Sequence, residues 1–240
     1  MRILVVNVNT SRSMTDSIVA SAQAVSSPGT EIVGLTPTFG AESCEGNVES
    51  YLAAVGVLDR VLKYPEPFDA VIQAGFGEHG REGLQEALDV PVVDITEAAA
   101  MVASLLGHKF GVVTTLDRTV PLIEDRLLLA GLDRRCAAIV ASGLSVLELE
   151  EDRARTVAAI VAKAKEIVAN HGVEVICLGC GGMAGLDDAV AAATGAPVVD
   201  GVASAVTLAE ALVRMKLSTS KVRTYAPARI KRMAGWPLPS

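Results

Sequence analysis

Short apolar runs alternate with longer stretches of helical periodicity along most of the chain. The apolar runs predict strands at residues 3–6, 31–35, 70–74, 91–94, 110–113, 137–141, 175–178 and 197–200. The amphipathic and Ala-rich stretches predict helices at residues 14–24, 48–62, 81–88, 95–106, 120–130 and 150–170, with two more after residues 186 and 200. Strands that alternate with helices throughout indicate a parallel α/β fold.

Three pairs of landmarks recur at a spacing of 105 to 107 residues. The stretch 90–98 resembles 196–204, the first strand resembles the one at 109–114, and glycine-rich loops begin at Gly75 and around Cys180. We therefore expect two similar, interlocked parallel α/β halves with pseudo-twofold symmetry. Residues 1–95 and 205–240 are assigned to the first half, and residues 96–204 to the second. The expected active site is the cleft between the halves.

The glycine-rich loop of the second half carries a thiol directly after a buried strand, in the run Leu178-Gly179-Cys180-Gly181-Gly182-Met183. The carboxyl edge of a parallel sheet is where such folds bind ligands, so Cys180 is a candidate acid, base or nucleophile. Cys177 lies inside the apolar run and is expected to be a small buried side chain. A zinc or redox Cys-x-x-C pair is weakly supported, because no second pair follows.

Polar side chains follow other strands at the same expected edge. Asn9, Thr10 and Ser11 come after the first strand, and Thr114 and Thr115 after the fifth. These groups could donate hydrogen bonds to a carboxylate or an imide carbonyl, although Thr10 or Ser13 could instead cap the following helix. The run Gly75-Phe76-Gly77-Glu78-His79-Gly80 forms the second glycine-rich exit.

Composition narrows the class of protein. Half of the 240 residues are hydrophobic but only 3% are aromatic, and the net charge is −7 without a Lys/Arg cluster. This charge argues against nucleic acid as a partner. No apolar run is long enough for a membrane span, no signal-peptide pattern begins the chain, and four cysteines do not suggest a disulfide framework. We expect a cytoplasmic protein that binds a small molecule.

These motifs resemble the aspartate/glutamate racemase superfamily, and within it the hydantoin and allantoin racemases. The matching stretches are residues 3–11, 113–116, 120–125, 178–183, 197–201 and 219–222. The resemblance implies an enzyme that needs neither cofactor nor metal, that is often a homo-oligomer, and that exchanges the proton on an acidic carbon. In such a reaction one group removes the proton from one face of the carbon, and a second group returns a proton to the other face.

One position departs from the family pattern, which places a cysteine in both glycine-rich loops. Cys180 matches the second cysteine, but Gly75 stands at the first, with Phe76 and Gly77 fitting around it. Three interpretations follow. The chain is a racemase in which His79 or Glu78 supplies the missing group. It is a single-thiol decarboxylase, as in the arylmalonate decarboxylases that this site also resembles. Or it binds a small ligand without turnover.

We favour racemisation of a hydantoin-like cyclic ureide, with Cys180 acting on one face. His79 is the first candidate for the other face because imidazole titrates near neutral pH, although it could equally be a solvent-facing residue at a helix start. Glu78 is the next candidate. The groups expected to bind substrate or stabilise its enolate are Asn9, Thr10, Ser11, Gly75, Phe76, Gly77, Thr114, Thr115, Gly181 and Gly182. Asp94 and Asp200 are expected to hold loops or cap helices.

Overall fold

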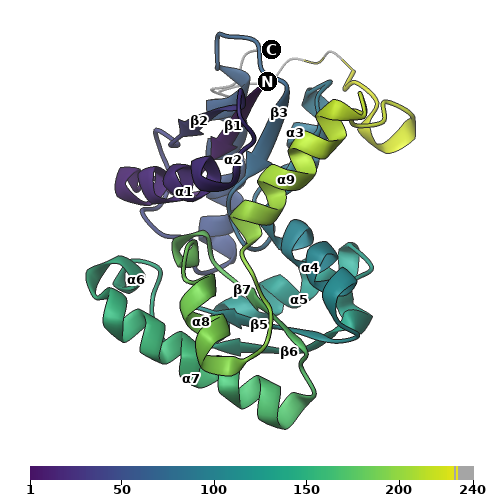
Figure 1. Cartoon of the computed structure of the whole chain (residues 1–240). Helices are drawn as coiled ribbons and strands as arrows, with labels where there is room; N and C mark the ends of the chain where they lie inside the picture. The colour runs from purple at the N-terminus through teal and green to yellow at the C-terminus, as the bar shows by residue number, and fades with distance from the viewer. Residues whose placement is uncertain (230, 232–240) are drawn as a thin grey trace.

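Two four-stranded parallel sheets form the centre of the protein in the computed structural model, which describes residues 1–229 and 231 (Figure 1). The first sheet has the order β2-β1-β3-β4 and the second the order β6-β5-β7-β8. The strands are β1 Arg2–Val6, β2 Glu31–Leu35, β3 Ala70–Gln73, β4 Val92–Asp94, β5 Phe110–Thr114, β6 Cys136–Ala141, β7 Val175–Leu178 and β8 Val198–Val199. The two strand orders correspond one to one, so the predicted pair of similar α/β halves is confirmed.

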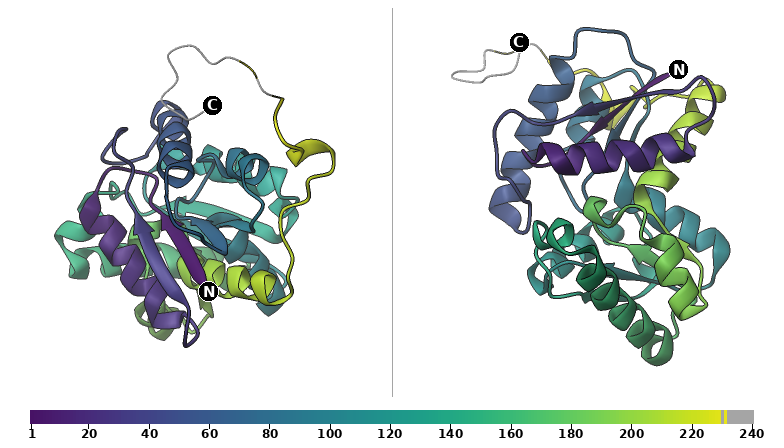
Figure 2. Two further views of the ribbon diagram at one scale, coloured as in Figure 1. Left: turned by 90° about the horizontal axis from the view of Figure 1, so that it is seen from above. Right: turned by 60° about the vertical axis from the view of Figure 1, so that its left-hand side comes forward.

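Helices cover both sheets, and the right-hand view of Figure 2 shows the two halves stacked one above the other. The helices are α1 Arg12–Val25, α2 Asn47–Leu62, α3 Arg81–Ala87, α4 Ile95–Leu106, α5 Val120–Leu129, α6 Glu148–Glu151, α7 Arg153–His171, α8 Asp187–Thr194 and α9 Gly201–Arg214. Strands β1, β3, β5 and β7 are almost wholly buried, because helices cover both faces of each sheet. This burial explains why they are continuous apolar runs in the sequence.

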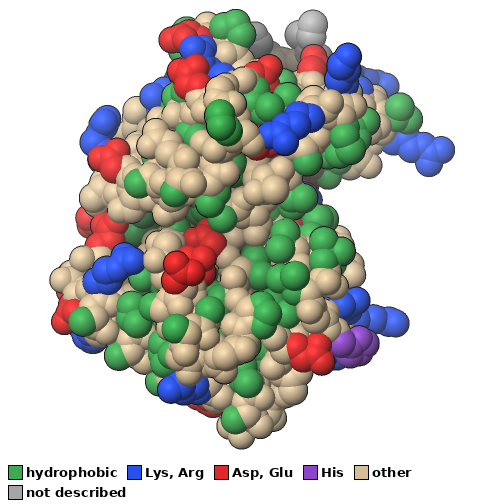
Figure 3. All heavy atoms as spheres, viewed as in Figure 1, with side chains coloured by type: hydrophobic (Ala, Val, Ile, Leu, Met, Phe, Trp, Pro, Cys, Tyr) green, Lys and Arg blue, Asp and Glu red, His purple; other side chains and the backbone are tan. Residues whose placement is uncertain are grey.

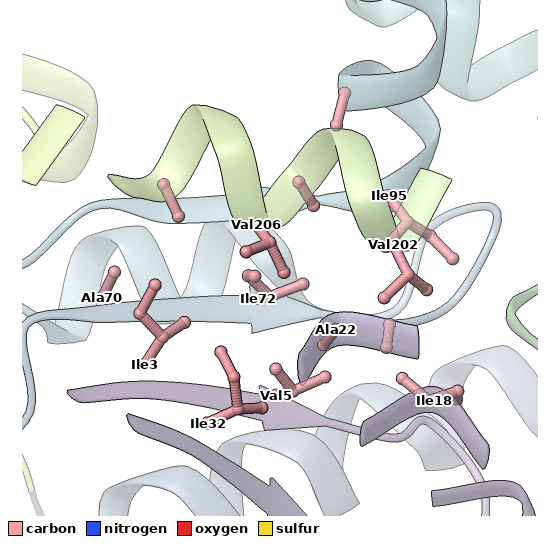
Figure 4. Packing of buried hydrophobic residues seen from close by; sticks show 14 of the residues in the cluster. Ile3, Val5, Ile18, Ala22, Ile32, Ala70, Ile72, Ile95, Val202 and Val206 are labelled. Carbon is pink, nitrogen blue, oxygen red and sulfur yellow. The ribbon is translucent and has the colours of Figure 1, made fainter. Parts of the chain in front are cut away.

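Helices α4 and α9 cross between the halves. Helix α4 follows β4 of the first sheet, yet its alanines pack against Phe110, Val175 and Cys177 of the second. Helix α9 follows β8 of the second sheet and packs Val202 and Val206 against Ile72 of the first (Figure 4). The crossing agrees with interlocked halves, while the exact division of the chain at residues 95 and 204 stays a prediction.

Aspartate caps fix the starts of the two crossing helices, and a glycine allows the helices to approach closely. Asp94 accepts hydrogen bonds from the N–H groups of Thr96 and Glu97 at 2.8 and 2.9 Å, and Asp200 does the same at the start of α9. The prediction that these aspartates cap helices is therefore confirmed. A Cβ on Gly201 would lie 2.7 Å from the carbonyl oxygen of Ile95, so a side chain there would push the helices apart.

Two local predictions were wrong. The helix expected over 150–170 is interrupted at Asp152, whose backbone is extended and whose carboxylate accepts a hydrogen bond from the N–H of Arg155. An aspartate that caps a new helix competes with continuation of the preceding one. Ser11 caps α1, rather than Thr10 or Ser13, and the helix begins at Arg12.

The tail runs along the first half as far as it is described. Thr219 donates to the carbonyl of Val90, and Lys221 donates to the carbonyls of Gln85 and Glu86. The part of the tail at residues 230 and 232–240 lies outside the described residues. Within the described residues, no helix is both long enough and apolar enough to cross a membrane.

Candidate active site

A cavity with both polar and apolar walls lies where the carboxyl ends of both sheets face each other. It holds about 430 Å³ of space, part of which is open to solvent. Segments that follow β1, β3, β5 and β7 line it, so each half supplies two of the loops. The lining residues are Asn7, Val8, Asn9, Met14, Cys44, Ala74, Gly75, Phe76, His79, Thr114, Thr115, Thr119, Val146, Gly179, Cys180 and Gly181. This is the predicted cleft between the halves.

The half-buried thiol of Cys180 lies in this cavity at the end of β7. Its Sγ accepts a hydrogen bond from the N–H of Gly182 at 3.4 Å. Burial raises the pKa of Cys180 to about 11, the Gly182 N–H opposes that rise, and the charges of Glu45 and Glu150 add to it. The resting thiol is therefore protonated near neutral pH and is equipped to give a proton rather than to take one.

The ring of His79 occupies the space that a side chain at position 75 would need. A Cβ on Gly75 would lie 2.5 Å from Cγ1 of Val8, 2.7 Å from Nε2 of Gln73 and against Cδ2 of His79. Glycine at this position therefore makes room for the imidazole.

We expect Gly75→Ala to lower the free energy of unfolding by about 1–3 kcal/mol, because the added methyl overpacks the site. Urea unfolding measures the change. The matched control is the double variant Gly75→Ala/His79→Ala. If the ring is the obstacle, the alanine at position 75 costs clearly less when His79 is already removed. An equal cost in both backgrounds would contradict this explanation.

His79 is buried and uncharged. Burial lowers the pKa of its imidazole to about 4, although the carbonyl of Phe76 offsets part of that shift. Its Nδ1 has no hydrogen-bond partner among the described residues. The expectation that His79 titrates near neutral pH is thus not met, because the ring is shielded from water at the cavity wall.

Glu78 lies outside the cavity lining. Its Oε2 is 2.6 Å from Nη1 of Arg126, and its Oε1 accepts a hydrogen bond from the N–H of Gly80 at 3.0 Å. Burial and the neighbouring Glu82 carboxyl raise the pKa of Glu78 above its usual value of 4.5, while Gly80 and Arg126 oppose the rise. The flanking residues Gly77 and Gly80 both have positive φ, at 131° and 91°.

Several donors in the cavity are free for a ligand. The side-chain N–H₂ of Asn9 has only the sulfur of Met14 as an acceptor, at 3.2 Å. The hydroxyl of Thr115 and the backbone N–H groups of Phe76 and Gly181 donate to no acceptor among the described residues. The Thr114 hydroxyl is already used, since it donates to the carbonyl of Gly179 at 3.1 Å.

The structure brings some of the predicted site residues together and leaves others out. Eight of them line the cavity: Asn9, Gly75, Phe76, His79, Thr114, Thr115, Cys180 and Gly181. Outside the lining, the Thr10 hydroxyl donates to the carbonyl of Ala41 and the Ser11 hydroxyl caps α1. The N–H of Gly77 donates to the Thr96 hydroxyl, and Gly182 contributes through its bond to Cys180.

Sequence reasoning missed part of the lining. Thr119 is polar and lies in the segment that follows β5, so its type and position could have indicated it. Cys44, Met14 and Val146 had no such signal, because a loop, a helix and a second loop carry them to the cavity. Among the described residues, no group of three or more His, Cys, Asp or Glu side chains is placed to hold a metal ion.

Comparison with known proteins agrees with this arrangement. The family model described as Asp/Glu/Hydantoin racemase matches residues 3–209. A hydantoin racemase of Rhizobium meliloti is 39% identical over 98% of each chain. The crystal structure of an allantoin racemase from Pseudomonas fluorescens is 68% identical with a TM-score of 0.97, covering 98% of this chain and 100% of the other. An allantoin racemase structure from Klebsiella pneumoniae is 38% identical with a TM-score of 0.95, covering 98% of this chain and 96% of that one.

Proposed function

This chain belongs to the Asp/Glu/Hydantoin racemase family, and we propose that it racemises a 5-substituted hydantoin or a related cyclic ureide such as allantoin. The acidic carbon lies next to a carbonyl, so its proton can be removed to give an enolate. The named relatives at 38% to 68% identity support this substrate class. The reaction needs only proton transfers, and we propose that it uses no cofactor.

One observation carries the proposal. The Cys180 thiol from the second half and the Gly75–Gly80 loop from the first half meet at a single cavity with an uncharged lining. A planar carbon held between them has the thiol on one face and, on the other, a loop that carries the ionisable side chains of Glu78 and His79. The free donors of Asn9, Thr115 and the backbone at Phe76 and Gly181 support binding of the enolate oxygen.

For the second face we propose Glu78, with His79 as a neutral wall of the cavity. An imidazole whose pKa lies near 4 is a weak base at neutral pH, and its neutral form is a poor acid. A carboxyl with a raised pKa can alternate between its two forms more readily. The role requires Glu78 to turn from Arg126 towards the cavity, which the two flanking glycines with positive φ make easier.

Substitution in the Gly75 loop tests this assignment. We expect Glu78→Gln to lower kcat for racemisation about 10²-fold or more, because it removes one proton carrier. His79→Gln should act mainly on KM. The pH profile of kcat/KM should fall on the acidic side through the raised pKa of Glu78, without a separate inflection from His79. If His79→Gln abolishes turnover and Glu78→Gln does not, the roles are reversed.

Chiral chromatography tests the function itself. Starting from either pure enantiomer of a 5-substituted hydantoin, the enzyme should reach the same equal mixture. The interpretation as a single-thiol decarboxylase, favoured only by Gly75, makes a different prediction. The enzyme would release carbon dioxide from a disubstituted malonate and would leave the hydantoin unchanged. A ligand that raises the melting temperature without turnover would support the binding interpretation.

We also propose that the protein is a cytoplasmic homo-oligomer. Met101, Leu105 and Leu106 of α4 are exposed, and Figure 3 shows hydrophobic side chains gathered beside the hollow between the halves. An apolar surface of this kind is typical of contacts between protein chains. Size-exclusion chromatography with light scattering would give the number of subunits.

A further inference from the structure

The wall of the active-site cavity carries no formal charge. No Lys, Arg, Asp or Glu is among its lining residues, and its ionisable groups are His79, Cys44 and Cys180. Burial holds the imidazole neutral and raises the pKa of both thiols, that of Cys44 to about 12. A substrate that enters with a carboxylate therefore meets amides, hydroxyls and thiols, but no cation to pair with.

Two carboxylates lie beside this neutral wall and join the two halves across it. Glu45 follows Cys44 of the lining, and its Oε1 accepts a hydrogen bond at 2.9 Å from the N–H of Val146, a lining residue of the other half. Glu150 accepts a hydrogen bond at 2.9 Å from the hydroxyl of Ser13, the neighbour of the lining residue Met14. Both carboxylates thus sit next to the cavity on opposite sides of the junction.

Both charges reach the reacting thiol. The negative charges of Glu45 and Glu150 each add to the raised pKa of Cys180, in agreement with their hydrogen bonds to Val146 of the lining and to Ser13 beside the lining residue Met14. A cation also lies on this side: the exposed guanidinium of Arg118 reaches over Gly46, the neighbour of Glu45, beside Glu49, and like the two carboxylates it is outside the lining. The carboxylates of Glu45, Glu49 and Glu150 outnumber this guanidinium, so the neutral interior of the cavity has a negative surrounding.

We propose that Glu45 and Glu150 are specificity-determining residues that make the site accept uncharged cyclic ureides and reject substrates bearing a carboxylate. The inference rests on the proposed racemisation and adds the rule by which its substrates are chosen. Within a Debye length of about 8 Å, each carboxylate is expected to weaken the binding of an anion about tenfold. The same charges disfavour the enolate, so selectivity is gained at some loss of rate.

A pair of ligands that differ in charge but little in shape tests the rule: hydantoin-5-acetic acid and its amide. The variants are Glu45→Gln, Glu150→Gln and the double variant. Glutamine keeps an acceptor oxygen for the N–H of Val146 and for the Ser13 hydroxyl, so both bridges can persist. The control is Glu151→Gln, which removes a charge from the next position of α6, where the exposed side chain bonds to no described residue.

Two readouts are needed, namely kcat/KM for exchange of the C5 proton and Kd from calorimetry. We expect the wild type to prefer the amide about 100-fold, each single variant to reduce that preference about tenfold, and the double variant nearly to abolish it. Exchange of the amide should persist in all variants and rise with each charge removed, because the same charges disfavour its enolate, and this activity also shows that the variants fold. The control should keep the wild-type ratio.

Equal use of both ligands by the wild type, or a preference that the double variant leaves unchanged, would overturn the selection rule while the racemase function stands. If the wild type exchanges neither ligand, the racemase proposal fails. The ratio of the two Kd values then still decides the selection rule, because binding does not require turnover.

Discussion

We expect Cys180→Ala to lose racemisation by about 10³-fold or more, because in the proposed mechanism it removes the proton carrier of one face and water cannot replace a positioned group in the cavity. The thiol is half-buried at the end of β7, with the Gly182 N–H directed at its sulfur. Removing a single sulfur atom there should change the free energy of unfolding by only about 1 kcal/mol. Activity and stability should therefore separate, which optical rotation and urea unfolding measure on the same sample.

Cys136→Ala is the matched control for this variant. Cys136 is likewise a half-buried thiol whose pKa burial raises to about 12, but it lies on β6 and does not line the active-site cavity. Its replacement should leave racemisation within about twofold of the wild type. If Cys180→Ala retains more than about a tenth of the activity, the thiol is not the proton carrier of either face.

Arg126→Ala is expected to lower the free energy of unfolding by about 3–5 kcal/mol, because it leaves buried carboxylates without their cation. The Arg126 side chain is 1% exposed on α5 of the second half. It contacts Glu78 and Glu82 at 2.6 Å, pairs with Glu97, and lies 3.5 Å from the fully buried Asp94. Asp94 ends β4, and the other three acidic groups belong to the loop and helices that follow β3 and β4.

The loss of unfolding free energy in Arg126→Ala should depend on pH. Without the guanidinium, burial raises the pKa of Asp94 further above its unfolded value, so the protonated form is favoured in the folded state. A raised carboxyl pKa destabilises the fold increasingly as the pH rises through and above the unfolded value. The variant should therefore recover part of its deficit between pH 7 and pH 5.

Arg155→Gln provides the comparison for a surface ion pair. Arg155 is 57% exposed and lies 3.3 Å from Glu148, and such pairs contribute about 1 kcal/mol or less. Urea unfolding of both variants at pH 7 and pH 5 checks the prediction. Arg81 also contacts these groups, at 2.8 Å from Glu82, 2.6 Å from Glu97 and 3.5 Å from Asp94. A loss below about 1 kcal/mol for Arg126→Ala would show that Arg81 alone compensates the acidic groups.

The strands were predictable because each is a short apolar run buried on both faces. Glycines and polar residues end these runs, and their positions also indicated which loops line the cavity. The repeat of Asp94 and Asp200 indicated the two helix caps because a capping carboxylate is a local feature, set within three residues of the helix start.

Long-range contacts explain what could not be predicted. The position of Glu78 is set by Arg126, which is 48 residues away in sequence and belongs to the other half. The lowered pKa of His79 depends on burial that only the assembled cavity provides. Cys44 reaches the cavity through a loop without periodic pattern, where its thiol donates to the carbonyl of Val8 at 3.4 Å. None of these contacts leaves a mark at fixed spacing in the sequence.

Proton NMR in deuterium oxide tests the central claim most directly. An enantiopure 5-substituted hydantoin is incubated with the wild-type enzyme, and loss of the C5 proton signal is followed together with loss of optical rotation. If the reaction is proton transfer at one carbon, the wild-type enzyme accelerates both loss of the C5 proton and loss of optical rotation, and the product carries deuterium at C5. The variant Cys180→Ala should accelerate neither process. A C5 proton that persists across several substituents while the wild-type protein is folded would contradict the account.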